Sequence, residues 1–265
     1  MNSRIIYLKI CFFAFLFSSC GDNDFDNTDA IEGEGPIVSE IIPVSDFIGV
    51  DLLGSFDVDI VQGSEQIVTA EGQANIIDRL KLEVNDDILS VTLEDGSYQN
   101  FDLMIFIQSP MIETYQLTGS GDMTIDGYEN LENLNILLLG SGNIIGGNSF
   151  LVENSASLNL TGSGSIFLEI ETLETIGSDI LGSGDINLSG QTLSQTVAII
   201  GSGNYNAFDL ISDSAEITIV GSGDVQVTVN NTLTGELSGS GSIFYKGDPT
   251  IDVSVLAEGN VVNAN

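Results

Sequence analysis

The sequence predicts an all-β chain that folds as a right-handed parallel β-helix, a β-solenoid with rungs of about twenty residues. Three observations lead to this prediction. A Gly-Ser-Gly triplet recurs seven times, at intervals of 21, 22, 20, 19, 20 and 18 residues. Apolar and polar residues alternate in segments such as Phe56–Ile60 and Leu80–Val84, which is the pattern of half-buried strands. No long segment has the 3.6-residue period of a helix.

The seven triplets mark the expected corners of the solenoid. Their first glycines are Gly119, Gly140, Gly162, Gly182, Gly201, Gly221 and Gly239. Each copy has an apolar residue two positions before the triplet and Asp, Asn or Ser directly after it. A corner that needs a positive φ favours glycine, and a second glycine lets rungs stacked about 4.8 Å apart approach without a Cβ between them. A lone rung buries too few aliphatic side chains to offset its ordering entropy, so the rungs must fold together.

The start of the chain is expected to be a lipoprotein signal peptide over residues 1–19. Arg4 and Lys9 precede a short apolar stretch that ends in two serines and Cys20. That stretch is shorter than the ~20 apolar residues of a membrane span. The region resembles a bacterial lipobox, with Phe17 where leucine is usual, so we predict a lipid on Cys20 and the membrane as its partner. An ordinary secreted protein with an incidental cysteine is the alternative.

Residues 20–40 are expected to form a lipidated, acidic, disordered tether. Within it, Asp22–Asp26 resembles the acidic signals that send some Gram-negative lipoproteins to the outer face of the outer membrane. We therefore expect an outer-membrane lipoprotein on the surface of a Gram-negative cell. A position facing the periplasm is the alternative.

The solenoid domain is expected over residues 41–265, in three parts. Residues 41–112 are less regular and are expected to cover one end, although Gly54–Val58 is a degenerate copy of the repeat. Residues 113–245 hold the Gly-Ser-Gly array. Residues 246–265 are expected to cap the other end.

Composition excludes several classes of function. The chain has 39 acidic residues against 5 basic ones, a formal net charge of −34, which excludes ordinary nucleic-acid binding. It has no histidine and two cysteines, so it lacks the residues for Ser/His, Cys/His and zinc chemistry. The carboxylates of Asp86 and Asp87 lie in a turn-like context, and neighbours on a strand point to opposite faces. We predict that the chain is not an enzyme and needs no cofactor, with weak calcium binding as the one exception considered.

One apolar pair is predicted on the outside of the array. If Ile144 and Ile166 point inward, then Ile145 and Phe167 point outward on consecutive rungs and touch. Such a pair marks a contact with a partner or with a second copy in a homo-oligomer, unless another part of the chain covers it. Phe244 is expected to point outward in the same column, which elsewhere holds Thr124, Asn187, Asn206 and Gln226, as on an ordinary solvated surface.

The segment Asp46–Gly63, followed by Ser109–Glu113 and the serial Gly-Ser-Gly copies, resembles the head-GIN domain of putative auto-transporter adhesins. The resemblance covers about residues 40–260. It implies a solenoid-like β fold on an exported lipoprotein, with adhesion proposed and no activity or ligand established. We therefore expect a non-catalytic, lipid-anchored surface protein that acts as an adhesin or structural interaction module on an unknown protein or glycan. The alternatives are an envelope glycan- or lipid-binding protein and, third, a carbohydrate-active enzyme.

Overall fold

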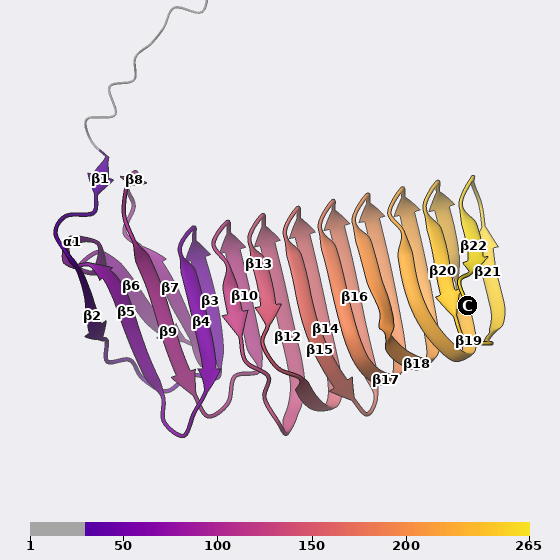
Figure 1. The fold of residues 1–265 in the computed structure, drawn as a ribbon, viewed down its shortest axis with the longest axis horizontal. Coiled ribbons are helices and arrows are strands. Elements are labelled where there is room, and N and C mark those ends of the chain that lie inside the picture. Colours follow the sequence, from indigo (N-terminus) through magenta and orange to yellow (C-terminus); the bar gives the residue numbers. More distant parts are fainter. Residues whose placement is uncertain (1–29) are drawn as a thin grey trace, which may run out of the picture.

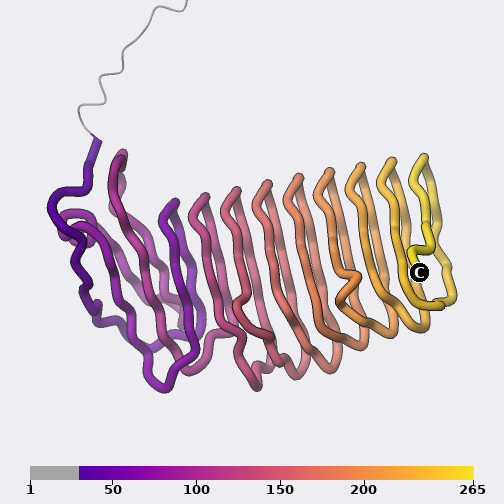
Figure 2. The backbone as a smooth tube through the Cα atoms, in the orientation of Figure 1, coloured from indigo at the N-terminus to yellow at the C-terminus, as the bar shows by residue number. Residues whose placement is uncertain are grey.

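The computed structural model describes residues 30–265, and these residues form a long β-solenoid (Figure 1). The coils stack side by side along one axis, as the backbone trace in Figure 2 shows. The predicted β-solenoid is therefore confirmed. The predicted signal peptide, Cys20 and residues 20–29 of the predicted tether lie outside the described residues. Residues 30–40, predicted as part of the disordered tether, are described and contain strands at Ile31–Glu32 and Ile37–Ile41.

The strands divide into a mixed N-terminal part and a parallel array. The N-terminal elements are β1 (Ile31–Glu32), β2 (Ile37–Ile41), β3 (Gly49–Gly54), β4 (Asp57–Gln62), β5 (Ile67–Gln73), α1 (Ala74–Ile77), β6 (Leu80–Asn85), β7 (Ile88–Leu93), β8 (Tyr98–Gln99) and β9 (Leu103–Ser109). The array elements are β10 (Thr114–Gly119), β11 (Met123–Ile125), β12 (Leu131–Gly140), β13 (Asn143–Gly146), β14 (Phe150–Gly162), β15 (Ser165–Thr172), β16 (Thr175–Gly182), β17 (Asp185–Gly201), β18 (Asn204–Gly221), β19 (Val225–Gly239), β20 (Ser242–Lys246), β21 (Thr250–Val255) and β22 (Asn260–Asn263).

The first glycines of the triplets lie in a single column along the axis. Each pairs in register with the first glycine of the next copy, from Gly119 and Gly140 through to Gly239. Gly54 pairs with Gly119 on the other side, so the degenerate copy forms the first rung of the same stack. Residues about twenty apart in sequence therefore become direct neighbours.

The corner geometry requires glycine for two separate reasons. At Gly182 the backbone has φ 128°, a conformation that side chains with a Cβ rarely adopt. A Cβ there would also collide with the carbonyl oxygen of Gly162. That carbonyl accepts hydrogen bonds from the backbone N–H groups of Ser183 at 2.9 Å and Gly184 at 3.1 Å. Gly239 lacks the positive φ, yet a Cβ on it would still collide with Gly221.

In several copies the side chain of the residue after the triplet links one rung to the next. The Oδ1 atom of Asp122 accepts hydrogen bonds from the backbone N and the Nδ2 of Asn143, both at 2.9 Å. Asp185 accepts the same two bonds from Asn204, again at 2.9 Å. The Oδ1 of Asn204 then accepts the backbone N–H of Asp224 at 3.1 Å. The turn-forming residues of the repeat thus form a ladder parallel to the axis in two runs, from Asp122 to Asn143 and from Asp185 to Ser242.

The N-terminal end of the stack is covered by strands that do not follow the repeat. β3 and β4 form the first rung, and on their outer side lie β7 and β9, both parallel to them. Between these, the chain forms the antiparallel pairs β5–β9 and β6–β7, and β2 joins β5 antiparallel. The chain therefore forms the first rung with β3 and β4, covers one side of it with β5 to β9, and pairs with its opposite side at β10.

The C-terminal residues continue the ladder. β21 pairs parallel with β19, and β22 pairs parallel with β20. The backbone N–H of Gly259 donates to Gly239 at 3.1 Å. Residues 246–265, predicted as a cap, thus contribute one further rung of the same type.

Inward-pointing aliphatic side chains fill the solenoid and form one continuous core. Consecutive rungs contribute the same position, as with Ile144, Ile166 and Ile186, all fully buried. Burying each such side chain stabilises the fold by about 2 kcal/mol. Because this interior is solid, ligands can reach only the outer surface.

Candidate binding grooves on the solenoid

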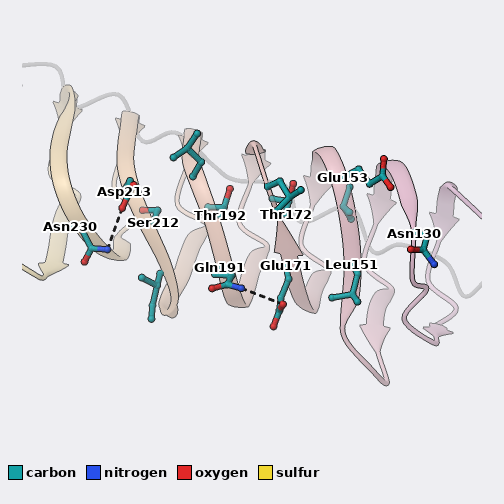
Figure 3. A pocket seen from close by; sticks show the side chains of 14 residues that line it. Asn130, Leu151, Glu153, Glu171, Thr172, Gln191, Thr192, Ser212, Asp213 and Asn230 are labelled. Atoms are coloured by element: carbon teal, nitrogen blue, oxygen red, sulfur yellow. Dashed lines mark hydrogen bonds between the residues drawn. The ribbon is translucent and has the colours of Figure 1, made fainter.

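A shallow groove of about 600 Å³ crosses several rungs at the edge opposite the glycine corners; we call it the corner groove (Figure 3). Parallel pairing places Leu151 beside Glu171, Glu171 beside Gln191, and Gln191 beside Ile211. Leu173 at the turn between β15 and β16 also lines it. The groove therefore consists of outward columns and corner residues from successive rungs.

Large aliphatic side chains give the corner groove its apolar character. Leu173 is 77% exposed, Leu193 54% and Ile211 51%. Such exposure costs free energy in water, and aliphatic residues gathered in one groove are typical of binding surfaces. The groove can therefore bury an apolar group of a ligand.

Carboxylates frame the corner groove. Glu153, Glu171 and Asp213 line it. The Nε2 of Gln191 donates to Glu171 at 3.4 Å, and the Nδ2 of Asn230 donates to Asp213 at 3.5 Å. No lysine or arginine lines the groove. Its rim therefore favours neutral or cationic groups and repels anions.

Buried hydroxyl groups form the floor of the corner groove. Thr172 donates to the carbonyl of Asn154 at 3.0 Å, and Thr192 donates to that of Ser194 at 3.0 Å. These groups are satisfied by the chain itself, which makes them part of the fold and leaves the rim to contact a ligand.

A buried polar chain runs below this floor. The Tyr205 hydroxyl donates to Gln195 at 3.1 Å, and the Gln195 amide donates to the hydroxyl of Ser212 at 2.7 Å. Burial raises the pKa of the Tyr205 hydroxyl well above its usual range. The tyrosine is therefore a neutral, structural group.

A second groove of about 510 Å³ lies on another face; we call it the side groove. Phe167, Asn187, Asn206 and Gln226 line it from four successive rungs. The Nδ2 of Asn206 donates to the Oδ1 of Asn187 at 3.0 Å. Phe167 is 44% exposed. The side groove thus combines an aromatic ring with a row of amides.

A bulge in β18 forms the opposite wall of the side groove. Ala207 pairs with Val227, and the next paired residue is Ile211, so Phe208 to Leu210 have no strand-pairing partner on β19. The hydroxyl of Thr228 on β19 donates to the Phe208 carbonyl at 2.7 Å. This bulge raises Phe208 and Asp209 beside the amide row. The Nζ of Lys246 lies 4.3 Å from the centre of the Phe208 ring, a cation–π contact that fixes the ring.

The predicted outward pair is found side by side. Ile145 pairs with Phe167 on the neighbouring rung, and their exposed fractions are 38% and 44%. Phe167 lines the side groove and Ile145 lies just outside it. The alternation in the sequence therefore predicted the residues at one end of this groove. It did not predict the opposite wall, because the β18 bulge does not change the spacing of the triplets.

The carboxylates form no metal centre within residues 30–265, where no group of three or more His, Cys, Asp or Glu side chains is placed to hold an ion. Asp86 and Asp87 form the turn between β6 and β7, with φ 50° and 60°. Burial, reinforced by the charge of Asp126, raises the pKa of Asp59. In the same part of the chain, no helix is long and apolar enough to cross a membrane.

Taken together, the stacked rungs and their surface grooves define a repeat protein of the β-solenoid class whose sides are available for binding. The chain belongs to the family described as "Putative auto-transporter adhesin, head GIN domain", whose model matches residues 46–249. This membership confirms the predicted resemblance and indicates an exported or cell-surface protein. A comparison with curated proteins found no match.

Solved structures with this fold come from Parabacteroides and Bacteroides species. A putative lipid binding protein from Parabacteroides distasonis is 26% identical, with a TM-score of 0.77, and the match covers 89% of this chain and 100% of that one. A putative adhesin from Parabacteroides merdae is 22% identical, with a TM-score of 0.78 and the same coverage. A putative adhesin from Bacteroides fragilis is 22% identical, with a TM-score of 0.65, covering 88% and 100%. The two adhesins show a shared fold.

Proposed function

We propose that this chain is a non-catalytic, lipid-anchored surface protein that binds a partner through the sides of its solenoid, as an adhesion module. The observation that supports this most is the pair of grooves, each of which spans several consecutive rungs and opens to solvent. A rod with a solid core and lateral grooves suits binding to an extended partner, and membership of an adhesin family agrees with that role.

Anchoring through Cys20 fits the direction of the rod. The described chain starts at β1, beside the covered N-terminal end (Figure 1). A lipid before residue 30 would hold the molecule by that end, so the array with both grooves would extend away from the membrane. We propose the outer membrane of a Gram-negative cell as the location, with display on the cell surface preferred over the periplasmic side.

The test is adhesion by whole cells that carry the native chain or Cys20→Ser. In native cells the chain should incorporate labelled palmitate, and these cells should adhere to host or microbial surfaces more than cells lacking the gene. Cys20→Ser should abolish lipid labelling and surface adhesion together while leaving the purified domain folded. Adhesion equal to that of cells lacking the gene would overturn the proposed function.

A second candidate function is the binding of an amphiphile in the corner groove. Its aliphatic lining supports this candidate, as does the likeness to a protein described as lipid binding. The acidic rim would select a neutral or cationic head group over a phosphate. Nile red fluorescence should rise on binding and fall when Leu173 and Leu193 are changed to serine. The matched control changes Leu181 and Ile200, which are 51% and 55% exposed and lie outside the groove.

A further inference from the structure

The side groove is part of a column whose chemistry changes along the solenoid. Its outward residues on five consecutive rungs are Phe167, Asn187, Asn206, Gln226 and Phe244, each paired with the next. An aromatic residue stands at each end and three amides stand between them. Rungs repeat about every 4.8 Å, close to the length of one pyranose unit in an extended polysaccharide chain, so one sugar unit can face each rung.

The amides of this column have free hydrogen-bonding capacity. A carboxamide both donates and accepts hydrogen bonds, which matches sugar hydroxyl groups, because these also do both. Asn206 uses its Nδ2 to bond Asn187 at 3.0 Å, and this leaves its Oδ1 for a ligand. Gln226 lines the groove, and among the described residues no hydrogen bond engages its amide, which leaves that amide for a ligand.

The aromatic and acidic groups restrict the ligand further. The half-exposed ring of Phe167 offers an apolar face against which the C–H face of a sugar ring can pack. Glu169 and Asp209 line the same groove and accept hydrogen bonds while repelling anions. The nearest basic group, Lys246, is held over the Phe208 ring. These features select a neutral glycan over one that carries sulfate or uronic acid groups.

We propose that the side groove binds a linear neutral glycan laid along the solenoid axis. A sugar ring packs on Phe167, the next units bond to Asn206 and Gln226, and Asp209 on the bulge accepts a hydroxyl from the side. This inference rests on the proposed function of surface binding and names the class of ligand. An amide ladder alone also stabilises stacked rungs, so the test must separate binding from folding.

The experiment titrates the intact chain carrying Cys20→Ser with three probes: cellohexaose, mannohexaose and hexagalacturonate. Calorimetry should detect saturable binding of at least one neutral hexamer and none of the anionic one. Phe167→Ala and Gln226→Ala should each weaken that binding by roughly two- to tenfold. Gln226 has no bond within the fold, so its substitution leaves the melting temperature unchanged. The matched control is Thr124→Ala, in the same column but outside the groove, which should bind as the native chain does.

The glycan assignment would be overturned if neither neutral hexamer binds, or if Gln226→Ala binds the hexamer as tightly as the native chain does. The cell assay distinguishes this from failure of the proposed function. Adhesion that survives both Phe167→Ala and an excess of the hexamer leaves the adhesion function standing and removes the glycan. Glycan binding in solution by a chain whose cells do not adhere supports the site and removes the adhesion function.

Discussion

The regular array and the N-terminal end are both built from β-strands but pair them in different ways. In the array, rungs that are consecutive in the sequence lie side by side, every pairing is parallel, and glycine corners recur at each rung. At the N-terminal end the chain builds the first rung, departs into antiparallel pairs and a short helix, and then returns past that rung. The contrast shows that the repeat specifies how rungs stack on one another. The N-terminal residues that depart from the repeat instead cover the edge strands of the first rung.

The largest effect is expected at a glycine corner in the middle of the array. Gly182→Ala places a Cβ against the Gly162 carbonyl at a positive φ, which should cost about 3–5 kcal/mol of unfolding free energy. Gly177 is the matched control on the same strand, because a Cβ there meets nothing within 4 Å. Denaturant unfolding followed by circular dichroism measures both. Equal losses of unfolding free energy in the two variants would mean that the glycine corner is not the source of the strain.

Truncating a core residue should separate the two regions in a second way. Ile105 in the N-terminal end and Ile186 in the array are both fully buried, and each change to alanine should cost about 2–4 kcal/mol. Hydrogen exchange should show Ile105→Ala exposing residues 63–112 first, since that region closes on one side only. Ile186→Ala should loosen rungs on both of its sides. The same exchange pattern for both variants would mean that the two regions unfold as one unit.

A smaller loss is expected from the ladder beside the corners. Asp185→Ala removes the acceptor of two bonds from Asn204 and should lower the unfolding free energy by about 1–2 kcal/mol. Ser165 occupies the same column one rung earlier, and Ser165→Ala serves as the control with a loss below about 0.5 kcal/mol. Thermal melts at matched concentration measure the difference. A null effect of Asp185→Ala would make the ladder incidental.

The smallest effect is expected at Asp51 on the first rung, and it depends on pH. Burial raises the pKa of this carboxyl above 3.8, and its Oδ1 is buried without a hydrogen-bond partner. A raised pKa means that the protonated form stabilises the fold below the usual pKa, and that this contribution is lost as pH rises through the folded-state pKa. Asp51→Asn should therefore raise the melting temperature at pH 7 by roughly 2 °C, with the gain shrinking as pH falls and vanishing below the ordinary aspartate pKa, at about pH 3. An unchanged gain at about pH 3 would point to a cause other than charge.

The repeat made the array predictable and left the N-terminal end largely hidden. The seven triplets and the partial copy at Gly54 carry the corner and the register, and six of the seven first glycines have the expected positive φ. After β4 the chain covers one side of the first rung, and at β10 it pairs with the other side. No local sequence pattern shows which side of that rung a given segment will cover. The C-terminal residues, expected as a cap, pair as a further rung because β21 keeps the alternation and the register of β19.

The sequence predicted only some of the residues that line the grooves. Strict alternation identified Ile145 and Phe167 as outward neighbours. The wall formed by Phe208 arises from a bulge that shifts the register within β18, and the interval between the flanking triplets stays at 20 residues. The sequence did not predict the corner groove. Leu173 lies at the turn between β15 and β16, where alternation does not assign a face, and Leu193 lies where β17 passes around the same edge of the solenoid without a turn.

The most direct test of the account is whether residues one rung apart in the side groove are neighbours in solution. In a chain lacking Cys11 and Cys20, cysteines at positions 187 and 206 replace side chains that bond at 3.0 Å. On mild oxidation this pair should form an intramolecular disulfide rapidly, because adjacent strands fall within disulfide reach. Cysteines at positions 187 and 226 lie two rungs apart and should stay reduced. Bridging of the distant pair, or none in the adjacent pair, would contradict the stacked columns on which both grooves depend.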